Sequence, residues 1–287
     1  MSYIKKAYYR YKSLSKRVRD SISFSIFVIG LVSTVCTIIG YSLSDLKIDS
    51  ISYRLLIVIG LSIALYAVAY WVIGIIFKDR IGLTINNTSV EVSCGDIFAA
   101  EEYRVIGCDT HFHTTVDDVI ISKNSLQGKM VLEHGIADEI KAAVRKEAER
   151  LNLIPDENGL YTFPLGTIIR YDSSIDKKTY LMLAMTELNK DYESHTNMAK
   201  YEHMLMKMWN EISRVYASHD IVFPILGDGI TRFDDRPKDR YTLIRCMLCT
   251  LSGSGKHFNS KIKVMIYGKP DDIPLYELND IVKTLRR

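Results

Sequence analysis

Two long runs of apolar residues, uninterrupted by any charged side chain, dominate the first eighty residues. One run extends from Ser21 to Leu43 and the other from Leu55 to Phe77, and each holds 23 residues without Lys, Arg, Asp or Glu. A helix of that length measures about 34 Å, which is enough to cross a hydrocarbon core of roughly 30 Å. Core helices of soluble proteins are seldom apolar on every face over such a distance. The pattern therefore predicts a transmembrane hairpin of two helices.

After residue 80 the pattern changes to short apolar strands that alternate with amphipathic helices. A strand hairpin is expected over 82–93, and further strands over 103–108, 168–171, 180–188, 221–226 and 261–267. Helices are expected over 133–151, 197–218, 240–251 and 275–285. This order predicts an α/β fold: residues 81–287 form a three-layer domain with a mixed sheet between helices, and residues 1–80 form the hairpin and its basic leader.

The net charge changes sign at the same boundary. Lys and Arg exceed Asp and Glu by seven up to residue 80, whereas the remainder has a net charge of −4. A mildly acidic domain without a basic run disfavours nucleic acid as a partner. Basic residues precede the first apolar run and follow the second, so the positive-inside rule predicts a multi-pass protein with both termini in the cytoplasm and the loop 42–54 outside.

Cysteines and histidines give no sign of a metal centre. Cys246 and Cys249 lie within an apolar run that has neither turn residues nor a second cysteine pair nearby, and a zinc or redox site would need them. The histidines are scattered along the chain without the spacing of metal ligands. We therefore expect neither a metal nor a catalytic cofactor.

The most informative stretch of the second domain is IVFPILGDGITRF, residues 221–233. A buried strand that runs into Gly227-Asp228-Gly229 before a helix presents successive backbone N–H groups, which suit phosphate oxygens. Phe233 could then stack on a ribose or a base, and Arg232 could lie beside the charged end of the ligand. A plain strand-to-helix turn explains the same residues, so both interpretations stay open.

A second candidate is Cys94-Gly95-Asp96-Ile97, which also follows a strand. A carboxylate directly after a tight turn can accept a hydrogen bond from an exocyclic amine such as that of adenine. The alternative is a carboxylate that caps the helical turn beginning at Ile97. For this segment by itself, the cap is the favoured interpretation.

Together, a G-D-I segment after the second strand and a P-x-x-G-x-G-I loop after a late strand resemble the macro domain, a fold that binds ADP-ribose. The resemblance covers most of residues 82–287. It implies that Asp96 and Ile97 hold the adenine and that Phe233 lies near the ribose. It further implies that the phosphates are wrapped by Gly227, Asp228, Gly229, Ile230 and Thr231.

The sequence departs from the macro-domain pattern in two segments. Where the family carries I-V-N-A-A-N, this chain has VIGCDTHF, and where the family carries a triple-glycine loop, this chain has SKNSLQGKMV. The asparagine that hydrolytic members use could be replaced only by Asp109 or Asn124. We therefore expect a binding protein rather than an enzyme, with further ligand contacts from Asp109, Thr110, Phe112, Ser125, Leu126 and Gly128.

The complete arrangement, with a YTFPLGT segment over 161–167, resembles the membrane-bound effectors of type II Thoeris antiphage systems of bacteria. That resemblance implies that a partner with a TIR domain makes an ADP-ribose-derived signal, described as a histidine conjugate, which the macro domain binds. It also implies assembly into a homo-oligomer in the inner membrane, disruption of the lipid bilayer and cell death. The alternatives are a membrane-tethered ADP-ribosyl hydrolase and a scaffold that binds only protein.

Overall fold

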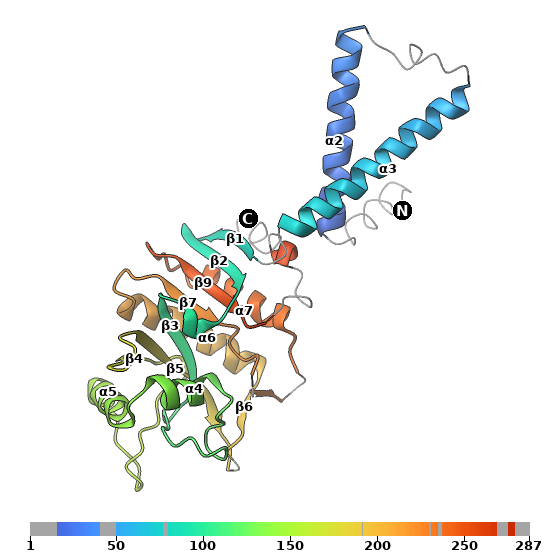
Figure 1. Cartoon of the computed structure of the whole chain (residues 1–287). Coiled ribbons are helices and arrows are strands. Elements are labelled where there is room, and N and C mark those ends of the chain that lie inside the picture. Colours follow the sequence, from blue (N-terminus) through green and yellow to red (C-terminus); the bar gives the residue numbers. More distant parts are fainter. Residues whose placement is uncertain are drawn as a thin grey trace. The chain divides into compact units, whose positions relative to one another are not determined.

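The computed structural model describes residues 16–40, 50–76, 80–190, 192–229, 231–234, 237–268 and 275–278. The chain divides into two compact units (Figure 1). The first unit comprises Met1–Asp79 together with Leu275–Asp280, and the second comprises Arg80–Pro274 together with Ile281–Arg287. The first unit is helical, whereas the second contains the sheet and its covering helices.

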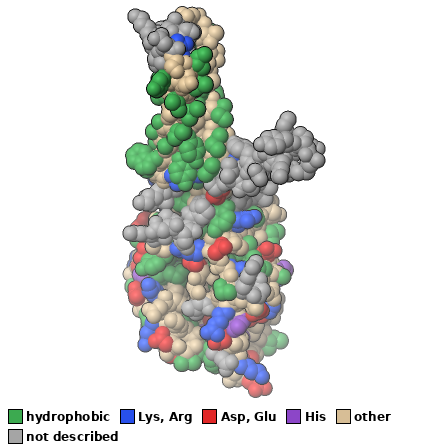
Figure 2. Space-filling view, turned by 90° about the vertical axis from the view of Figure 1, so that its right-hand side faces the viewer, with side chains coloured by type: hydrophobic (Ala, Val, Ile, Leu, Met, Phe, Trp, Pro, Cys, Tyr) green, Lys and Arg blue, Asp and Glu red, His purple; other side chains and the backbone are tan. Residues whose placement is uncertain are grey.

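The first unit is built on two helices, α2 (Lys16–Ile38) and α3 (Ile51–Ile76), which pack on each other. Both are long and apolar enough to cross a membrane. Their large side chains are mostly exposed, and Phe27, Leu61 and Trp71 are each 66% exposed. In the space-filling view, hydrophobic side chains cover the visible face of these helices (Figure 2). A core helix of a soluble protein would bury such side chains, so these exposed apolar faces suit a lipid environment.

Polar contacts join the base of α2 to α3 and to the short turn η4 (Leu275–Glu277). The Arg17 guanidinium lies 3.7 Å from the ring centroid of Tyr70, and its Nε donates to the Tyr70 carbonyl over 2.9 Å. The Tyr276 hydroxyl donates to the Asp20 carboxylate, and the neighbouring Leu275 is buried. The helix expected over 275–285 is described only as far as this turn, and its remaining part lies outside the described residues apart from residue 278.

The second unit contains one mixed sheet of nine described strands, in the order β1-β2-β9-β7-β3-β5-β6-β8, with β4 paired to β5. Strand pairs β1/β2, β4/β5 and β5/β6 are antiparallel, and the remaining pairs are parallel. The strands are β1 (Arg80–Ile85), β2 (Thr88–Cys94), β3 (Tyr103–Asp109), β4 (Ile168–Asp172), β5 (Thr179–Leu188), β6 (Ser194–Thr196), β7 (Ile221–Pro224), β8 (Arg232–Phe233) and β9 (Ile262–Ile266).

Helices cover both faces of this sheet. Successive residues of a strand point to opposite faces, so neighbouring residues pack against different helices. On β7, Val222 belongs to the core cluster that includes Ile140 and Val144 of α5, whereas the ring of Phe223 lies 5.2 Å from that of Trp209 on α6. The helical elements are η2 (Ile97–Ala99), α4 (Leu126–Lys129), η3 (Met130–His134), α5 (Ala137–Arg150), α6 (Met198–Val215) and α7 (Arg240–Gly253). The predicted three-layer arrangement with a mixed sheet is therefore confirmed (Figure 1).

One predicted helix boundary was wrong. The helix expected from residue 133 begins only at Ala137, because Gly135 has an extended backbone, with φ −118° and ψ 150°, that separates it from the preceding π-helical turn. The helix expected over 240–251 is confirmed as α7, and the two residues of β8 lie between it and the glycine loop. The short strands β6 and β8 were not predicted from the pattern.

Two glycines that precede β4, Gly159 and Gly166, together test how closely the chain approaches α6 at this point. Gly166 has φ +87°, and a Cβ added there would lie 2.5 Å from Cβ of Lys207 and 2.9 Å from the Met204 carbonyl oxygen of α6. Gly159 has φ +77°, but nothing lies within 4 Å of its Cβ position. We expect Gly159→Ala to cost about 1 kcal/mol from backbone strain, and Gly166→Ala to cost about 2–4 kcal/mol because overpacking adds to strain.

Urea unfolding of the two variants measures this difference. Equal losses of unfolding free energy would contradict the close approach of residue 166 to α6.

Candidate functional site

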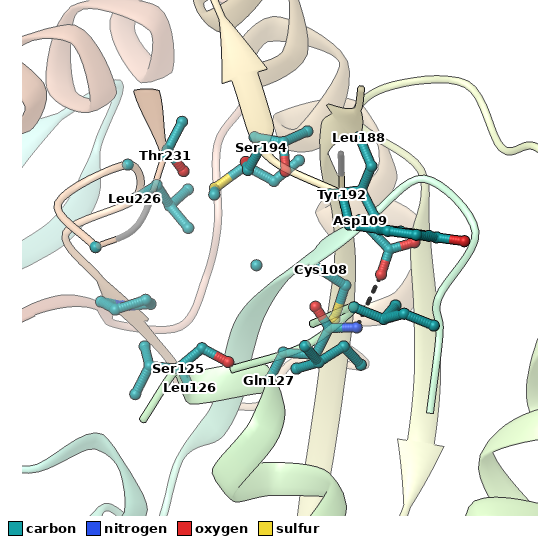
Figure 3. Close-up of a pocket in the computed structure, with 18 of the residues that line it drawn as sticks. Cys108, Asp109, Ser125, Leu126, Gln127, Leu188, Tyr192, Ser194, Leu226 and Thr231 are labelled. Carbon is teal, nitrogen blue, oxygen red and sulfur yellow. Dashed lines mark hydrogen bonds between the residues drawn. The ribbon is translucent and has the colours of Figure 1, made fainter. Parts of the chain in front are cut away.

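A pocket opens where the parallel strands β3, β5 and β7 reach their carboxyl ends (Figure 3). Loops that follow such strand ends are the common place for ligand sites in α/β sheets. One wall comes from the end of β3 and from α4, a second from the end of β5 with β6, and a third from the glycine loop after β7. Among the lining residues are Cys108, Asp109, Ser125, Leu126, Gln127, Leu188, Tyr192, Ser194, Leu226, Gly227, Gly229 and Thr231.

Asp109 ends β3, where the register with β5 shifts by one residue. Its side chain is buried, and four hydrogen bonds reach its two carboxylate oxygens. Oδ1 accepts from the backbone N–H of His111 over 2.8 Å and lies 2.9 Å from Nδ1 of His113. Oδ2 accepts from the N–H of His113 over 3.2 Å and from Nε2 of Gln127 over 3.0 Å. Both oxygens of this buried carboxylate are therefore fully occupied.

The electrostatics of Asp109 and His113 follow from this geometry. Burial by itself would raise the pKa of Asp109, but the hydrogen bond and charge of His113, together with Gln127 and the amide of His111, outweigh it and hold that pKa below its ordinary 3.8. The hydrogen bond to Asp109 raises the pKa of His113 above 6.5, against the opposing effect of burial. The two side chains therefore form an ion pair at least between pH 3.8 and pH 6.5.

The segment 122–128 contributes Ser125, Leu126 and Gln127 to the pocket wall. Ser125 caps α4, because its side chain accepts from the N–H of Gly128 over 2.9 Å. A Cβ on Gly128 would lie only 2.2 Å from the Ser122 carbonyl oxygen, so this position requires glycine. Gln127 of the same helix bonds both Asp109 and, over 3.0 Å, the carbonyl of His113. The end of β3 and this wall are therefore one hydrogen-bonded unit.

The glycine loop follows β7 and is supported from beneath by aromatic side chains. Gly227 has φ +87°, and its Cβ position lies 3.5 Å from the ring of Phe233. That ring packs on Tyr201 with centroids 5.5 Å apart, and the Tyr201 hydroxyl donates to the Leu226 carbonyl over 2.8 Å. Nothing lies within 4 Å of the Cβ position of Gly229, so the loop is open to the pocket there.

The segment expected to hold adenine lies outside the pocket lining. Oδ1 of Asp96 accepts from the N–H of Phe98 over 2.9 Å, so this carboxylate caps the turn η2. Ile97 is 5% exposed and belongs to the core cluster. The buried guanidinium of Arg104 donates to the carbonyls of Ile97 and Ala100 and thereby fixes the end of the turn.

The structure brings together only part of the expected site. The expected residues that line the pocket are Asp109, Ser125, Leu126, Gly227, Gly229 and Thr231. Those that do not line it are Asp96, Ile97, Thr110, Phe112, Gly128, Asp228, Arg232 and Phe233. Ile230 lies outside the described residues.

Several residues expected at the ligand contact their neighbours within the protein instead. Phe112 is buried, and its ring packs edge-on against Phe163 with centroids 5.1 Å apart. Arg232 forms an ion pair with Glu193 on the exposed side of β6. Phe233 is 8% exposed and supports the glycine loop from below, so the ring does not face the pocket.

Sequence reasoning missed the lining residues Cys108, Gln127, Thr186, Tyr192 and Ser194, which carry polar or aromatic groups. Gln127 stands in the SLQGK segment, where nothing marks it apart from a surface glutamine. Ser194 belongs to a strand of only three residues, too short for a recognisable alternation. Their roles follow from the strands that they meet, so no local signal could have found them.

The sheet order, and a cleft at these strand ends beside a glycine loop, define a macro-domain protein. A macrodomain from Oceanobacillus iheyensis with an aspartate-to-alanine substitution has a TM-score of 0.50 to this chain at 14% identity, over 71% of this chain and 98% of that chain. A glycine-to-valine mutant of the same macrodomain, solved with ADPR, has a TM-score of 0.48 at 14% identity, over 72% and 98% of the two chains.

The family is shown by sequence. The model of the macro domain of Thoeris protein ThsA matches residues 90–267, so this chain belongs to the Thoeris ThsA macro-domain family, with a role in antiphage defence. The Thoeris protein ThsA of Bacillus amyloliquefaciens (strain Y2) is 28% identical over 275 residues, which are 93% of this chain and 92% of that protein. The family expected from the sequence motifs is therefore confirmed.

The Asp109–His113 pair predicts a pH-dependent contribution to stability. Because the pKa of His113 is raised above 6.5, its stabilisation is complete below that pH and is lost as the pH rises through the raised value. Because the pKa of Asp109 is lowered below 3.8, its stabilisation is present above that pH and is lost as the pH falls through the lowered value. His113→Gln should therefore lower the melting temperature most between pH 3.8 and pH 6.5, and least at alkaline pH.

Melting temperatures of the wild type and His113→Gln from pH 4 to 9 measure this window. The exposed His203 on α6 offers a matched control, His203→Gln, which should show no such profile. A constant difference between His113→Gln and wild type at every pH would contradict the ion pair.

Proposed function

We propose that this chain is a membrane effector whose macro domain binds an ADP-ribose-derived signal, a histidine conjugate of ADP-ribose made by a TIR-domain partner, without hydrolysing it. The observation that carries the proposal is the pocket itself, in which an open glycine loop faces a buried, fully hydrogen-bonded Asp109. The match to the macro domain of Thoeris protein ThsA supports a ligand of this class.

The glycine loop suits the diphosphate of such a ligand. Gly227 adopts a positive φ that directs the backbone around the end of β7, and Gly229 leaves its backbone without a side chain against the pocket. Oriented backbone groups in a concave loop attract anions without a charged side chain. The Tyr201 hydroxyl and the Phe233 ring hold this loop from below, so little ordering is left for the ligand to impose.

The environment of Asp109 supports binding rather than hydrolysis. A general base needs a free lone pair directed at the attacking water and a pKa near the working pH. All four hydrogen bonds at Asp109 are directed to its carboxylate oxygens from within the protein, and its pKa is lowered. Asn124, the other expected substitute for the family asparagine, does not line the pocket. Neither Asp109 nor Asn124 therefore presents a free group that could activate a water molecule at this wall.

The helix pair supplies the output in this proposal. α2 and α3 span the inner membrane as a multi-pass hairpin with both termini in the cytoplasm, and ligand binding drives homo-oligomers that disrupt the bilayer and cause cell death. The exposed apolar faces of both helices support a lipid environment and contacts with further copies. Basic residues that flank the hairpin support the orientation.

Filling the pocket at Gly229 tests ligand binding. A Cβ at Gly229 meets no described atom within 4 Å, so the fold should tolerate Gly229→Phe while the ring extends into ligand space. We expect calorimetric titration of the full-length protein with histidine–ADP-ribose to show at least a 100-fold loss of affinity, or about 3 kcal/mol. The matched control is Gly82→Phe on β1, which also has open space and lies far from the pocket lining.

Two results would contradict the proposal. Equal affinity of Gly229→Phe and wild type would move the ligand away from this pocket. Release of free ADP-ribose from the conjugate by the wild type, abolished in Asp109→Asn, would establish the hydrolase alternative instead.

The membrane output requires its own measurement. Vesicles that contain the wild-type protein should release a trapped dye when histidine–ADP-ribose is added on the macro-domain side, and vesicles with Gly229→Phe should retain it. Dye release at the same rate with and without the nucleotide would contradict ligand gating.

A further inference from the structure

Ser194 carries a buried hydroxyl in the wall of the pocket. The residue is 8% exposed and lines the pocket, and its Oγ has no hydrogen-bond partner. Within the part of the chain that the structure describes, it is the one buried side-chain oxygen in this condition. A hydroxyl that is removed from water without a partner destabilises the fold. Because the Ser194 hydroxyl lines a ligand pocket, a bound ligand is the group that would supply its hydrogen-bond partner.

The backbone around Ser194 is fixed on both sides. Ser194 pairs with Leu188 of β5, and the following residues of β6 pair with β8. The connecting turn is closed by the N–H of Asn189, which donates to the Glu193 carbonyl over 3.0 Å, and by the N–H of Glu193, which donates to Oδ1 of Asn189 over 2.9 Å. The unpartnered hydroxyl is therefore not the product of a loose strand end.

Strand alternation separates Ser194 from the charged groups beside it. His195 points to the other face of β6, where its ring contacts the carboxylates of Glu193 and Asp234 at 3.3 and 3.1 Å. Ser194 lies on the buried face, together with Thr196. Rotation about a single torsion, χ1, directs the Ser194 hydroxyl to a ligand in the pocket.

The position of Ser194 indicates which part of a nucleotide it meets. In the pocket it lies between Leu226 and Thr231 of the glycine-loop side and Leu188, Tyr192 and Asp109 of the opposite side (Figure 3). The glycine loop offers backbone groups to phosphate oxygens, whereas the wall near Ser194 offers the side chains of Leu188 and Tyr192. A wall that combines apolar and aromatic surface with the Ser194 hydroxyl suits a furanose, whose C–H groups pack and whose hydroxyls both donate and accept.

We propose that the Ser194 hydroxyl is a specificity-determining contact for the sugar carried beyond the diphosphate of the bound nucleotide. This inference rests on the proposed function, because it requires an ADP-ribose-type ligand in the same pocket. A nucleotide that ends at the second phosphate leaves the hydroxyl unpartnered. One that continues into a ribose satisfies it, and the protein thereby distinguishes ADP-ribose from the more common ADP.

Ser173 provides a matched control, because it is a buried serine whose hydroxyl has partners. Its Oγ donates to the His134 carbonyl over 2.5 Å and accepts from the N–H of Ile175 over 3.1 Å. It is 4% exposed and does not line the pocket. Ser173→Ala therefore removes hydrogen bonds that serve the fold, whereas Ser194→Ala removes a hydroxyl that has no partner in the fold.

The experiment compares two ligands and two variants of the full-length protein. We expect Ser194→Ala to weaken ADP-ribose about fivefold, the usual effect of one hydrogen bond, while ADP changes less than twofold. The melting temperature of free Ser194→Ala should equal or exceed that of wild type, because an unpartnered hydroxyl is removed. Ser173→Ala should show the reverse, with a lower melting temperature and unchanged affinity for both nucleotides.

The outcomes separate this contact from the proposed function. Wild type that binds ADP-ribose, with Ser194→Ala equal to it for both ligands, would overturn the sugar contact alone. Equal losses for ADP and ADP-ribose would place the hydroxyl at the diphosphate and would also overturn it. Wild type that binds neither nucleotide nor histidine–ADP-ribose would overturn the proposed function and this contact together.

Discussion

The architecture of the site depends on one buried carboxylate. Asp109 ends the central strand β3, and its four hydrogen bonds tie that strand to the following backbone and to Gln127 of α4. A buried charge without such partners is strongly destabilising, so the fold is committed to this arrangement. Because His113 supplies both a backbone N–H and a ring nitrogen, the turn after β3 cannot rearrange without exposing or orphaning the carboxylate. The pocket wall therefore exists before any ligand arrives.

The same hydrogen bonds bear on whether Asp109 could act as a general base. A carboxylate that is saturated by its own chain gains little by approaching a water molecule, and its lowered pKa makes it a weak base. The glycine loop faces it from β7 and is held by Tyr201 and Phe233, whose contacts are equally internal. Both walls are thus preorganised, which reduces the ordering cost of binding. This preorganisation supports the proposal that the site binds a nucleotide without converting it chemically.

The sequence predicted features that arise within a single segment and missed those that arise between segments. The apolar runs of α2 and α3 and the buried strand β7 carry their own periodicity, so their existence could be predicted. Asp96 was open between adenine contact and helix cap, and the hydrogen bond from the Phe98 N–H shows the cap. Phe233 was expected at the ribose, yet Tyr201 of another helix draws it under the loop. Gln127 and β6 acquire their roles only from partners distant in the sequence, and no local pattern records those pairings.

The connectivity of the chain sets what the proposed gating requires. A ligand shifts an equilibrium only by the difference of its affinity for two states, so the strand ends must differ between the resting and active forms. The chain enters the sheet through β1 and leaves it after β9, and both strands pair with β2. Beyond β9 the segment at Leu275 joins the helical unit, where Tyr276 bonds Asp20 of α2. The unit that contains the sheet is therefore linked along the chain to α3 through β1. The segment after β9 links it to the helical unit, in which Tyr276 contacts α2. The proposed gating therefore has a connection along the chain to each helix of the hairpin, which a single tether would not provide.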